Sequence, residues 1–240
     1  MSGSPMTQRV QRLPTVRSIL AVCAHPDDES FGLGAALAMF DELDSATSVL
    51  CFTHGEASTL GADTPELGNV RAGELSAAAD ELGVTDVELL HYRDGHLSEE
   101  PLHELMTPIH RAVERSRAEL LLVFDEGGIT GHADHCRASE AAVAVARELG
   151  LPVLAWTLPE RVADALNHEF GAEFVGRSDR ELDFVVQVDR TRQRRAINQH
   201  VSQAVDNPVL ERRLELQGDE EVFRWLRAPL VFVHVRERAE

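Results

Sequence analysis

The feature that most constrains the fold is the alternation of short apolar runs with longer amphipathic segments. Five continuous apolar runs are predicted to be buried strands, at 16–24, 47–53, 87–92, 118–125 and 152–158. The segments between them carry apolar residues at helical spacing, at 30–43, 71–84, 101–117 and 138–150. Because strand–helix–strand units form parallel sheets covered by helices, this pattern predicts an α/β fold. We expect a Rossmann-like three-layer sandwich with a mostly parallel sheet and helices on both faces.

The last third of the chain is less regular. Strands are predicted at 182–189 and 230–235, with a helix at 190–205 between them. We find no internal repeat or linker, and a chain of 240 residues fits one large domain. We therefore expect a flexible N-terminal tail over 1–15 and a single α/β domain over 16–240, with a C-terminal subregion from about residue 180.

Composition argues against several classes of partner. The 41 acidic and 23 basic side chains give a formal net charge of −18, whereas nucleic-acid binding needs a face rich in Lys and Arg. The same charge argues against docking on anionic lipid, and no apolar run reaches the ~20 residues that span a bilayer. The three cysteines form no Cys-x-x-Cys pair, and the N-terminus lacks an apolar signal segment. These features predict a cytoplasmic protein without nucleic-acid or membrane partners.

Histidines and carboxylates follow the first four predicted strands. His25 and Asp28 follow the first strand, His54 the second, Asp94 the third and His135 the fourth. Because ligands bind beyond the carboxyl ends of parallel strands, we expect these turns to form one site. A dinucleotide site, the usual alternative in this fold class, needs G-x-G-x-x-G after the first strand. The third glycine is absent here, which disfavours an NAD-dependent oxidoreductase.

A metal centre fits these turns better. A catalytic zinc site uses three His or carboxylate ligands and keeps one position open. His25 and Asp28 lie three residues apart on a turn stiffened by Pro26, and His135 offers a third ligand across the crevice. Such a site leaves Zn²⁺ enough positive charge to polarise a water and a carbonyl oxygen. The spacing by itself is equally compatible with hydrated surface turns.

Two motifs in the chain resemble those of a known family. AHPDDE at 24–29, followed by HADH at 132–135, is similar to the paired signature of the LmbE-like, or PIG-L-like, zinc-dependent de-N-acetylases. RAGELSAAADELGV, RDGHL and QHVSQ also occur in the family's order, so that the similarity extends over about residues 17–227. The resemblance implies removal of an acetyl group from an N-acetylglucosaminyl-type conjugate, with Zn²⁺ as cofactor.

The resemblance also implies a role for each matching residue. It makes three residues the zinc ligands: His25, Asp28 and His135. Asp27 is implied to be the general base that takes a proton from the water. His132 is implied to stabilise the oxyanion and to protonate the leaving amine, with Asp134 orienting its imidazole. Arg71 and Asp94 are implied to contact sugar hydroxyls.

Several alternatives stay open at this point. A non-catalytic metal- or sugar-binding member of the same fold is one, although such a module has no need for Asp27 and His132. His54 fits a substrate contact or a structural histidine, and His200 fits a substrate or proton-transfer group or simple packing. The partner implied is a small-molecule amino-sugar conjugate of unspecified aglycone and acyl group. A homo-oligomer is compatible with the family, and other divalent ions compete with zinc for such ligands.

Overall fold

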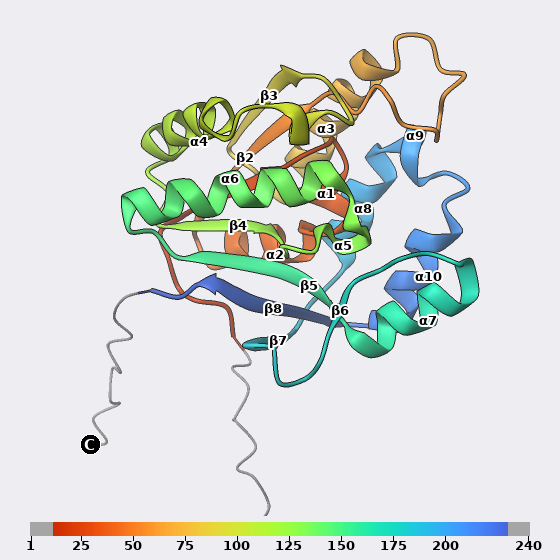
Figure 1. Cartoon of the computed structure of the whole chain (residues 1–240). Coiled ribbons are helices and arrows are strands. Elements are labelled where there is room, and N and C mark those ends of the chain that lie inside the picture. The colour runs from red at the N-terminus through yellow and green to blue at the C-terminus, as the bar shows by residue number, and fades with distance from the viewer. Residues whose placement is uncertain (1–11, 230–240) are drawn as a thin grey trace, which may run out of the picture.

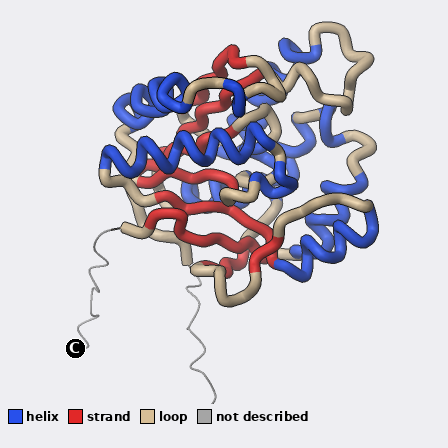
Figure 2. The backbone as a smooth tube through the Cα atoms, in the orientation of Figure 1, coloured by secondary structure: helices blue, strands red, loops and turns tan. Residues whose placement is uncertain are grey.

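A central sheet of eight strands organises the computed structural model, which describes residues 12–229 (Figures 1 and 2). The strands are β1 (Ser18–Cys23), β2 (Ala46–Thr53), β3 (Asp86–Tyr92), β4 (Leu120–Phe124), β5 (Val153–Pro159), β6 (Gly176–Arg177), β7 (Phe184–Gln187) and β8 (Glu220–Arg227). Their order across the sheet is β3-β2-β1-β4-β5-β8-β7, with β6 paired to β5. β1 to β5 run parallel, whereas β8 pairs antiparallel with β5 and β7.

Helices cover both faces of this sheet (Figure 1). They are α1 (Asp28–Phe31), α2 (Gly34–Glu42), α3 (Leu67–Leu82), α4 (Leu102–Ser116), α5 (Gly128–Gly131), α6 (Ala133–Leu149), α7 (Glu160–Phe170), α8 (Thr191–Gln199), α9 (Val201–Ala204) and α10 (Pro208–Gln217), with a 3-10 turn at Leu97–Glu99. Alternate residues of β1 point to opposite faces. Ile19 and Ala21 pack with α2 and α3, whereas Leu20 and Val22 pack with α4 and α6. Burial on both faces explains the continuous apolar runs, and the predicted fold class is confirmed.

The structure refines the predicted elements in the middle and the last third of the chain. The helix predicted at 30–43 divides into α1 and α2, and the helix predicted at 190–205 divides at His200 into α8 and α9. The sequence pattern did not predict α7, α10 or β8. The strand predicted at 230–235 and most of the tail predicted at 1–15 lie outside the described residues. Within 12–229, no helix has the length and apolarity needed to cross a membrane.

The topology places the turns after β1 and β4 side by side. From β1 the chain runs outward through β2 and β3 and then returns to the other side of β1 with β4. The two strands are direct neighbours, with Ile19 opposite Leu120. Since they run parallel, the segments that follow them leave the sheet at the same edge. This is the switch point of an open α/β sheet, where ligands bind.

The link between α1 and α2 has no room for a side chain at Gly32. A Cβ atom there would lie 2.3 Å from Phe124 Cε1 and 3.3 Å from Trp156 Cε3, both in buried rings. We expect Gly32→Ala to lower the free energy of unfolding by about 1–3 kcal/mol, as overpacking does, measured by urea denaturation. Gly73→Ala is the matched control, because an added Cβ meets nothing within 4 Å; it is expected to be neutral or to stabilise by up to about 1 kcal/mol. Equal stability of the two variants would contradict this account.

Candidate active site

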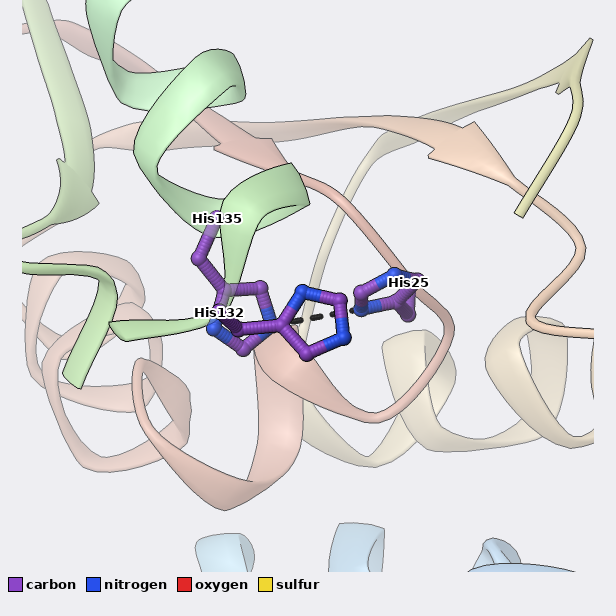
Figure 3. A group of neighbouring side chains, drawn as sticks. All are labelled: His25, His132 and His135. Atoms are coloured by element: carbon purple, nitrogen blue, oxygen red, sulfur yellow. Dashed lines mark hydrogen bonds between the residues drawn. The ribbon is translucent and has the colours of Figure 1, made fainter. Parts of the chain in front are cut away.

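The turns after β1 and β4 meet in a cavity of 530 Å³. Its lining includes seven of the eight predicted site residues: His25, Asp27, Asp28, Arg71, Asp94, His132 and His135. Asp134 is fully buried, and its carboxylate contacts His25. Figure 3 shows the imidazoles of His25, His132 and His135 gathered at one point, with ring centroids 4.8–5.1 Å apart. The structure therefore brings together residues that are more than 100 positions apart in the chain.

Hydrogen bonds determine which ring nitrogen is free in two of these histidines. His135 Nδ1 donates to the carbonyl of Gly128 at 3.0 Å, so Nε2 keeps its lone pair. His25 Nε2 lies 3.0 Å from Asp94 Oδ1 and 3.3 Å from Asp134 Oδ2, so it carries the proton and Nδ1 is free. The two free nitrogens are 3.2 Å apart (the dashed line in Figure 3). Two lone pairs facing each other at this distance repel unless a proton or a metal ion lies between them.

The carboxylate of Asp28 lies beside the ring of His135. Its Oδ2 accepts the backbone N–H groups of Ala24 and His25 at 2.9 and 3.0 Å, and its Oδ1 lies 3.1 Å from His135 Nε2. Ligand atoms of tetrahedral zinc, each ~2.0–2.1 Å from the metal, lie about 3.3 Å apart. The separations of His135 Nε2 from His25 Nδ1 and from Asp28 Oδ1, 3.2 and 3.1 Å, are close to this value. Metal-binding histidines also usually donate their second N–H to a carboxylate or a carbonyl. The three predicted ligands therefore lie in one cluster around His135, and their binding of a divalent metal ion stays a prediction.

The electrostatics of the site favour the same conclusion. Burial lowers the pKa of His25, but hydrogen bonds to Asp134 and Asp94 outweigh it and raise that pKa to about 10. Burial likewise lowers the pKa of His135, and the charge of Asp28 reverses this into a net rise. Burial raises the pKa of Asp28, whereas His135 and His25 lower it well below its usual value. The carboxylates thus create a field that attracts positive charge, and a divalent ion bound there competes with protons.

His132 is the third imidazole of the cluster, with one nitrogen within 4.8 Å of nitrogens of His25 and His135. It is the N-cap of α6, and its Nδ1 accepts the backbone N–H of Asp134 at 3.2 Å. A neutral ring whose Nδ1 accepts a hydrogen bond carries its proton on Nε2, so it offers a donor. Burial lowers the pKa of His132, and His135 and His25 lower it further, which favours this neutral form. The geometry suits a hydrogen-bond donor better than a metal ligand.

The structure corrects the expectation that the carboxylate of Asp134 orients His132. This carboxylate accepts the N–H groups of Gly95 and Leu97 at 2.7 and 3.0 Å, and it contacts His25 Nε2. Because a fully buried carboxylate needs hydrogen-bond donors, it turns toward these backbone groups and away from the exposed ring of His132. It is the backbone N–H of Asp134 that reaches His132. The Asp134 side chain therefore orients His25.

Arg71 and Asp94, the expected sugar contacts, line the cavity but also hold the turn after β1. Asp94 is 7% exposed and accepts the Nε2–H of His25 at 3.0 Å. Arg71 is 3% exposed and donates to Asp27 Oδ2 at 2.9 Å and to the carbonyl of Pro26. Both side chains therefore form hydrogen bonds within the site itself. Their contact with a sugar stays a prediction.

Asp27 has an unusual backbone conformation, with φ 116° and ψ −26°. This region costs a residue other than glycine of order 1–3 kcal/mol, and such strain is concentrated at functional sites. The side chain is 17% exposed, and burial raises its pKa to about 6, against the opposing charge of Arg71. A carboxyl group with a pKa near the working pH is suited to take up and return a proton.

A further part of the cavity lining was not predicted from the sequence. It is formed by apolar side chains and one buried arginine: Phe31, Phe124, Ile129, Phe174, Leu210 and Arg213. The guanidinium of Arg213 lies over the ring of Trp156, 5.2 Å from its centroid. Both Leu210 and Arg213 belong to α10. The available signal for α10 was Asn207 before Pro208, a typical helix start, and Asn207 Oδ1 does accept the N–H of Leu210 at 3.0 Å.

His54 lies in a second cavity of 720 Å³, beside the first. Its Nδ1 is 3.2 Å from the carbonyl of Gly68, and its Nε2 is 3.0 Å from Nδ1 of His91. The two imidazole rings stack at a centroid distance of 4.7 Å. These contacts correspond to the hydrogen-bonded structural histidine that was one of the two alternatives for His54.

Comparison with known proteins identifies the family. The profile of the PIG-L family, described as GlcNAc-PI de-N-acetylase, matches residues 20–146, more than half of the chain. The chain belongs to the PIG-L family. The resemblance expected from the motifs is confirmed, and the matched PIG-L region contains all three candidate metal ligands.

A curated relative extends this match beyond the family profile. The 1D-myo-inositol 2-acetamido-2-deoxy-alpha-D-glucopyranoside deacetylase 1 of Frankia casuarinae is 30% identical over 210 residues, covering 73% of this chain and 68% of the relative. The chain spans about half the length, 46–49%, of several further relatives that carry the same deacetylase name. The similarity to named deacetylases thus reaches past the two metal motifs.

Solved structures show the same fold. The A40926 pseudoaglycone deacetylase Dbv21 superimposes with a TM-score of 0.67 at 22% identity, covering 88% of this chain and 98% of that one. GalB, the 4-carboxy-2-hydroxymuconate hydratase of Pseudomonas putida KT2440, gives a TM-score of 0.68 at 16% identity, with coverage of 90% and 99%. Since this PIG-L fold supports more than one reaction, the activity has to be argued from the site.

Proposed function

We propose that the chain is a zinc-dependent hydrolase that removes the N-acetyl group from an N-acetylglucosaminyl-type conjugate. The observation that carries this proposal is that His135 Nε2 lies 3.2 Å from His25 Nδ1 and 3.1 Å from Asp28 Oδ1, beside the strained and largely buried Asp27. A carboxylate beside a metal site is suited to act as the base in amide hydrolysis by water. The named activity of the Frankia relative supports an amino-sugar conjugate as the substrate class.

The chain's own residues supply the proton transfers of this reaction. His25, Asp28 and His135 would hold the divalent metal, which would supply a Lewis acid to polarise the amide carbonyl and lower the pKa of a water. Asp27 accepts the proton of the attacking water on its carboxylate, which Arg71 orients from 2.9 Å. His132 donates a hydrogen bond from Nε2 to the oxygen that becomes negative. The proton that Asp27 took from the water passes to the leaving nitrogen. The C–N bond breaks, one water is consumed, and acetate and a primary amine result.

The alternatives from the sequence are less well supported by the site. A dinucleotide pyrophosphate needs free backbone N–H groups at the start of α1. The turn after β1 presents instead the carboxylates of Asp27, Asp28 and Glu29, and the N–H of Asp27 is taken by Glu29 Oε2. A binding module without catalysis does not need a strained aspartate with a raised pKa at position 27.

Removal of the metal tests the proposal directly. We expect the purified chain, after zinc loading, to hold about one zinc per site and to release a primary amine from N-acetylglucosaminyl conjugates. A chelator should abolish the amine signal, and added Zn²⁺ should restore it, because Asp27 alone does not polarise the carbonyl. Metal analysis and a fluorogenic amine assay measure the two quantities on the same sample. A chain that takes up no metal, or that hydrolyses equally well with chelator, would contradict the proposed function.

We infer a reducing compartment, the cytoplasm, from the cysteines. Cys23 and Cys51 are opposite one another in the register of β1 and β2, and both are buried and free. Cys136 is also free. Unpaired thiols on neighbouring strands are typical of proteins kept under reducing conditions.

A further inference from the structure

The backbone of Asp27 is held by a buried pair to which the mechanism above gives no role, Glu29 and His200. We propose that this pair is a positioning unit: it locks the Pro26–Asp27 peptide in the orientation that presents the Asp27 carboxylate beside the metal ligands. The proposal rests on the role of Asp27 in the proposed function. It names two positioning residues, of which His200 comes from a distant part of the chain.

The Pro26–Asp27 peptide is hydrogen-bonded at both of its polar groups. The N–H of Asp27 donates to Glu29 Oε2 at 2.9 Å, and the carbonyl of Pro26 accepts from Arg71 Nη2. A half-turn of this peptide would break both bonds and change φ of Asp27 by about 180°, from 116° to about −64°. Together with the ψ of −26°, that is an ordinary right-handed helical conformation. The relaxed backbone is therefore one peptide flip away, and these two hydrogen bonds oppose the flip.

Glu29 exerts this hold from a fixed position. Its second oxygen, Oε1, accepts from His200 Nε2 at 2.6 Å and from Ser30 Oγ at 2.5 Å. Glu29 and His200 are both 0% exposed. His200 lies between α8 and α9 and packs edge-on against Phe31, with ring centroids 5.8 Å apart. A residue 171 positions along the chain thus fixes the carboxylate that fixes the N–H of Asp27.

The contacts of the pair indicate positioning and not chemistry. Neither Glu29 nor His200 lines the catalytic cavity. His200 Nδ1 is buried and has no hydrogen-bond partner among the described residues, so the hydrogen bond of this ring is the one that holds Glu29. A buried carboxylate is costly unless it is fully hydrogen-bonded. Glu29 accepts from His200 and Ser30 on one oxygen, and its other oxygen accepts the N–H of Asp27. The proton-transfer alternative for His200 therefore has no geometric support, whereas packing with a positioning task does.

The decisive variants differ in whether residue 200 retains a hydrogen-bond donor. His200→Phe keeps a ring against Phe31 and removes the donor, whereas His200→Gln keeps an amide donor. We expect His200→Phe to lower kcat by about 10- to 100-fold and His200→Gln to stay within about threefold of wild type, since small displacements of a catalytic group have effects of this size. KM and the zinc content should be unchanged in both. His110→Phe is a surface control, because His110 forms an exposed pair with Glu148, at 2.8 Å, on α4 and α6.

A second substitution separates position from charge. Glu29→Gln keeps an oxygen for the N–H of Asp27, and His200 can move its proton to the unpartnered Nδ1 and accept from the new amide. We expect kcat of Glu29→Gln within about threefold of wild type, because the geometry is conserved. A 100-fold loss in this variant would overturn the proposal. The kcat of Glu29→Gln tests the proposal even if His200→Phe fails to fold.

A crystal structure of His200→Phe provides a readout that does not depend on activity. We expect Asp27 to occupy, at least in part, the flipped conformer with φ near −64°. A folded, zinc-loaded His200→Phe protein with wild-type kcat and φ unchanged at Asp27 would overturn the positioning unit, as would a loss confined to KM or to zinc content. If the wild-type chain hydrolyses no conjugate, the proposed function is wrong. The φ angle of Asp27 in the His200→Phe structure still tests whether Glu29 and His200 position this residue.

Discussion

Asp27→Asn is expected to lower kcat by about 10²–10⁴-fold, the range for loss of a general base, while the protein keeps its metal. The asparagine amide cannot accept the proton of the water. Its oxygen can still accept from Arg71, and asparagine tolerates a positive φ better than most residues, so the turn and its ligands should stay in place. The amine-release assay gives kcat, and metal analysis of the same preparation shows whether the site is intact.

A matched control for this substitution exists on the surface. Asp44 also has a positive φ, 61°, and lies exposed after α2. Asp44→Asn should leave both kcat and metal content at wild-type values, because Asp44 is exposed and does not line the cavity. Turnover of Asp27→Asn within twofold of this control would assign the base to another group. Loss of metal from Asp27→Asn would show instead that this carboxylate is a ligand.

His135→Ala is expected to weaken zinc binding by more than about 100-fold, since loss of even an outer partner of a ligand costs 10- to 100-fold. Activity should disappear with the metal. His132→Ala, three residues earlier on the same turn, should keep the metal and lose about 10²–10³-fold in kcat, as expected for one lost donor to an oxyanion. Competition with a chromogenic chelator measures zinc affinity in both variants.

These two variants serve as controls for each other because they lie at the same end of α6. A reversed pattern would exchange the roles of His132 and His135. Equal loss of zinc in both would indicate that the ion is held by the three imidazoles of His25, His132 and His135, which each have one nitrogen within 4.8 Å of the others. In that case Asp28→Asn should retain zinc, whereas the assignment made here expects it to be lost.

The sequence was most informative where one pattern has one physical cause. Strands buried on both faces need continuous apolar runs, so β1 to β5 were predicted to within a few residues of their ends. The last third was harder. β8 carries the sequence EEVFRWLR, whose charges resemble a surface segment, but Glu221 is fully buried and paired with Arg190 and Trp156. That pairing depends on residues from other elements, which no local pattern reports.

In the active site, too, local motifs predicted some features, and others depended on residues far away in the chain. The motifs at 24–29 and 132–135 were sufficient to name the candidate ligands, and parallel neighbouring strands then place both at one edge. The prediction that the Asp134 carboxylate orients His132 was wrong. This carboxylate accepts the N–H groups of Gly95 and Leu97, almost 40 positions away in the chain. The Glu29–His200 pair was missed for the same reason, although AHPDDE and QHVSQ were both recognised as motifs.

By itself the sequence determined the class of fold and which chemical groups stand at the ends of the strands. Local apolar patterns show which segments are buried and in what order strands and helices follow one another along the chain. Only the tertiary structure decided which nitrogen of His25 and His135 is free, and why Asp27 keeps its strained backbone. Those properties are set by hydrogen bonds to Gly128, Asp94 and Glu29. Such bonds depend on directions in space, and folding fixes these directions only when distant segments pack together.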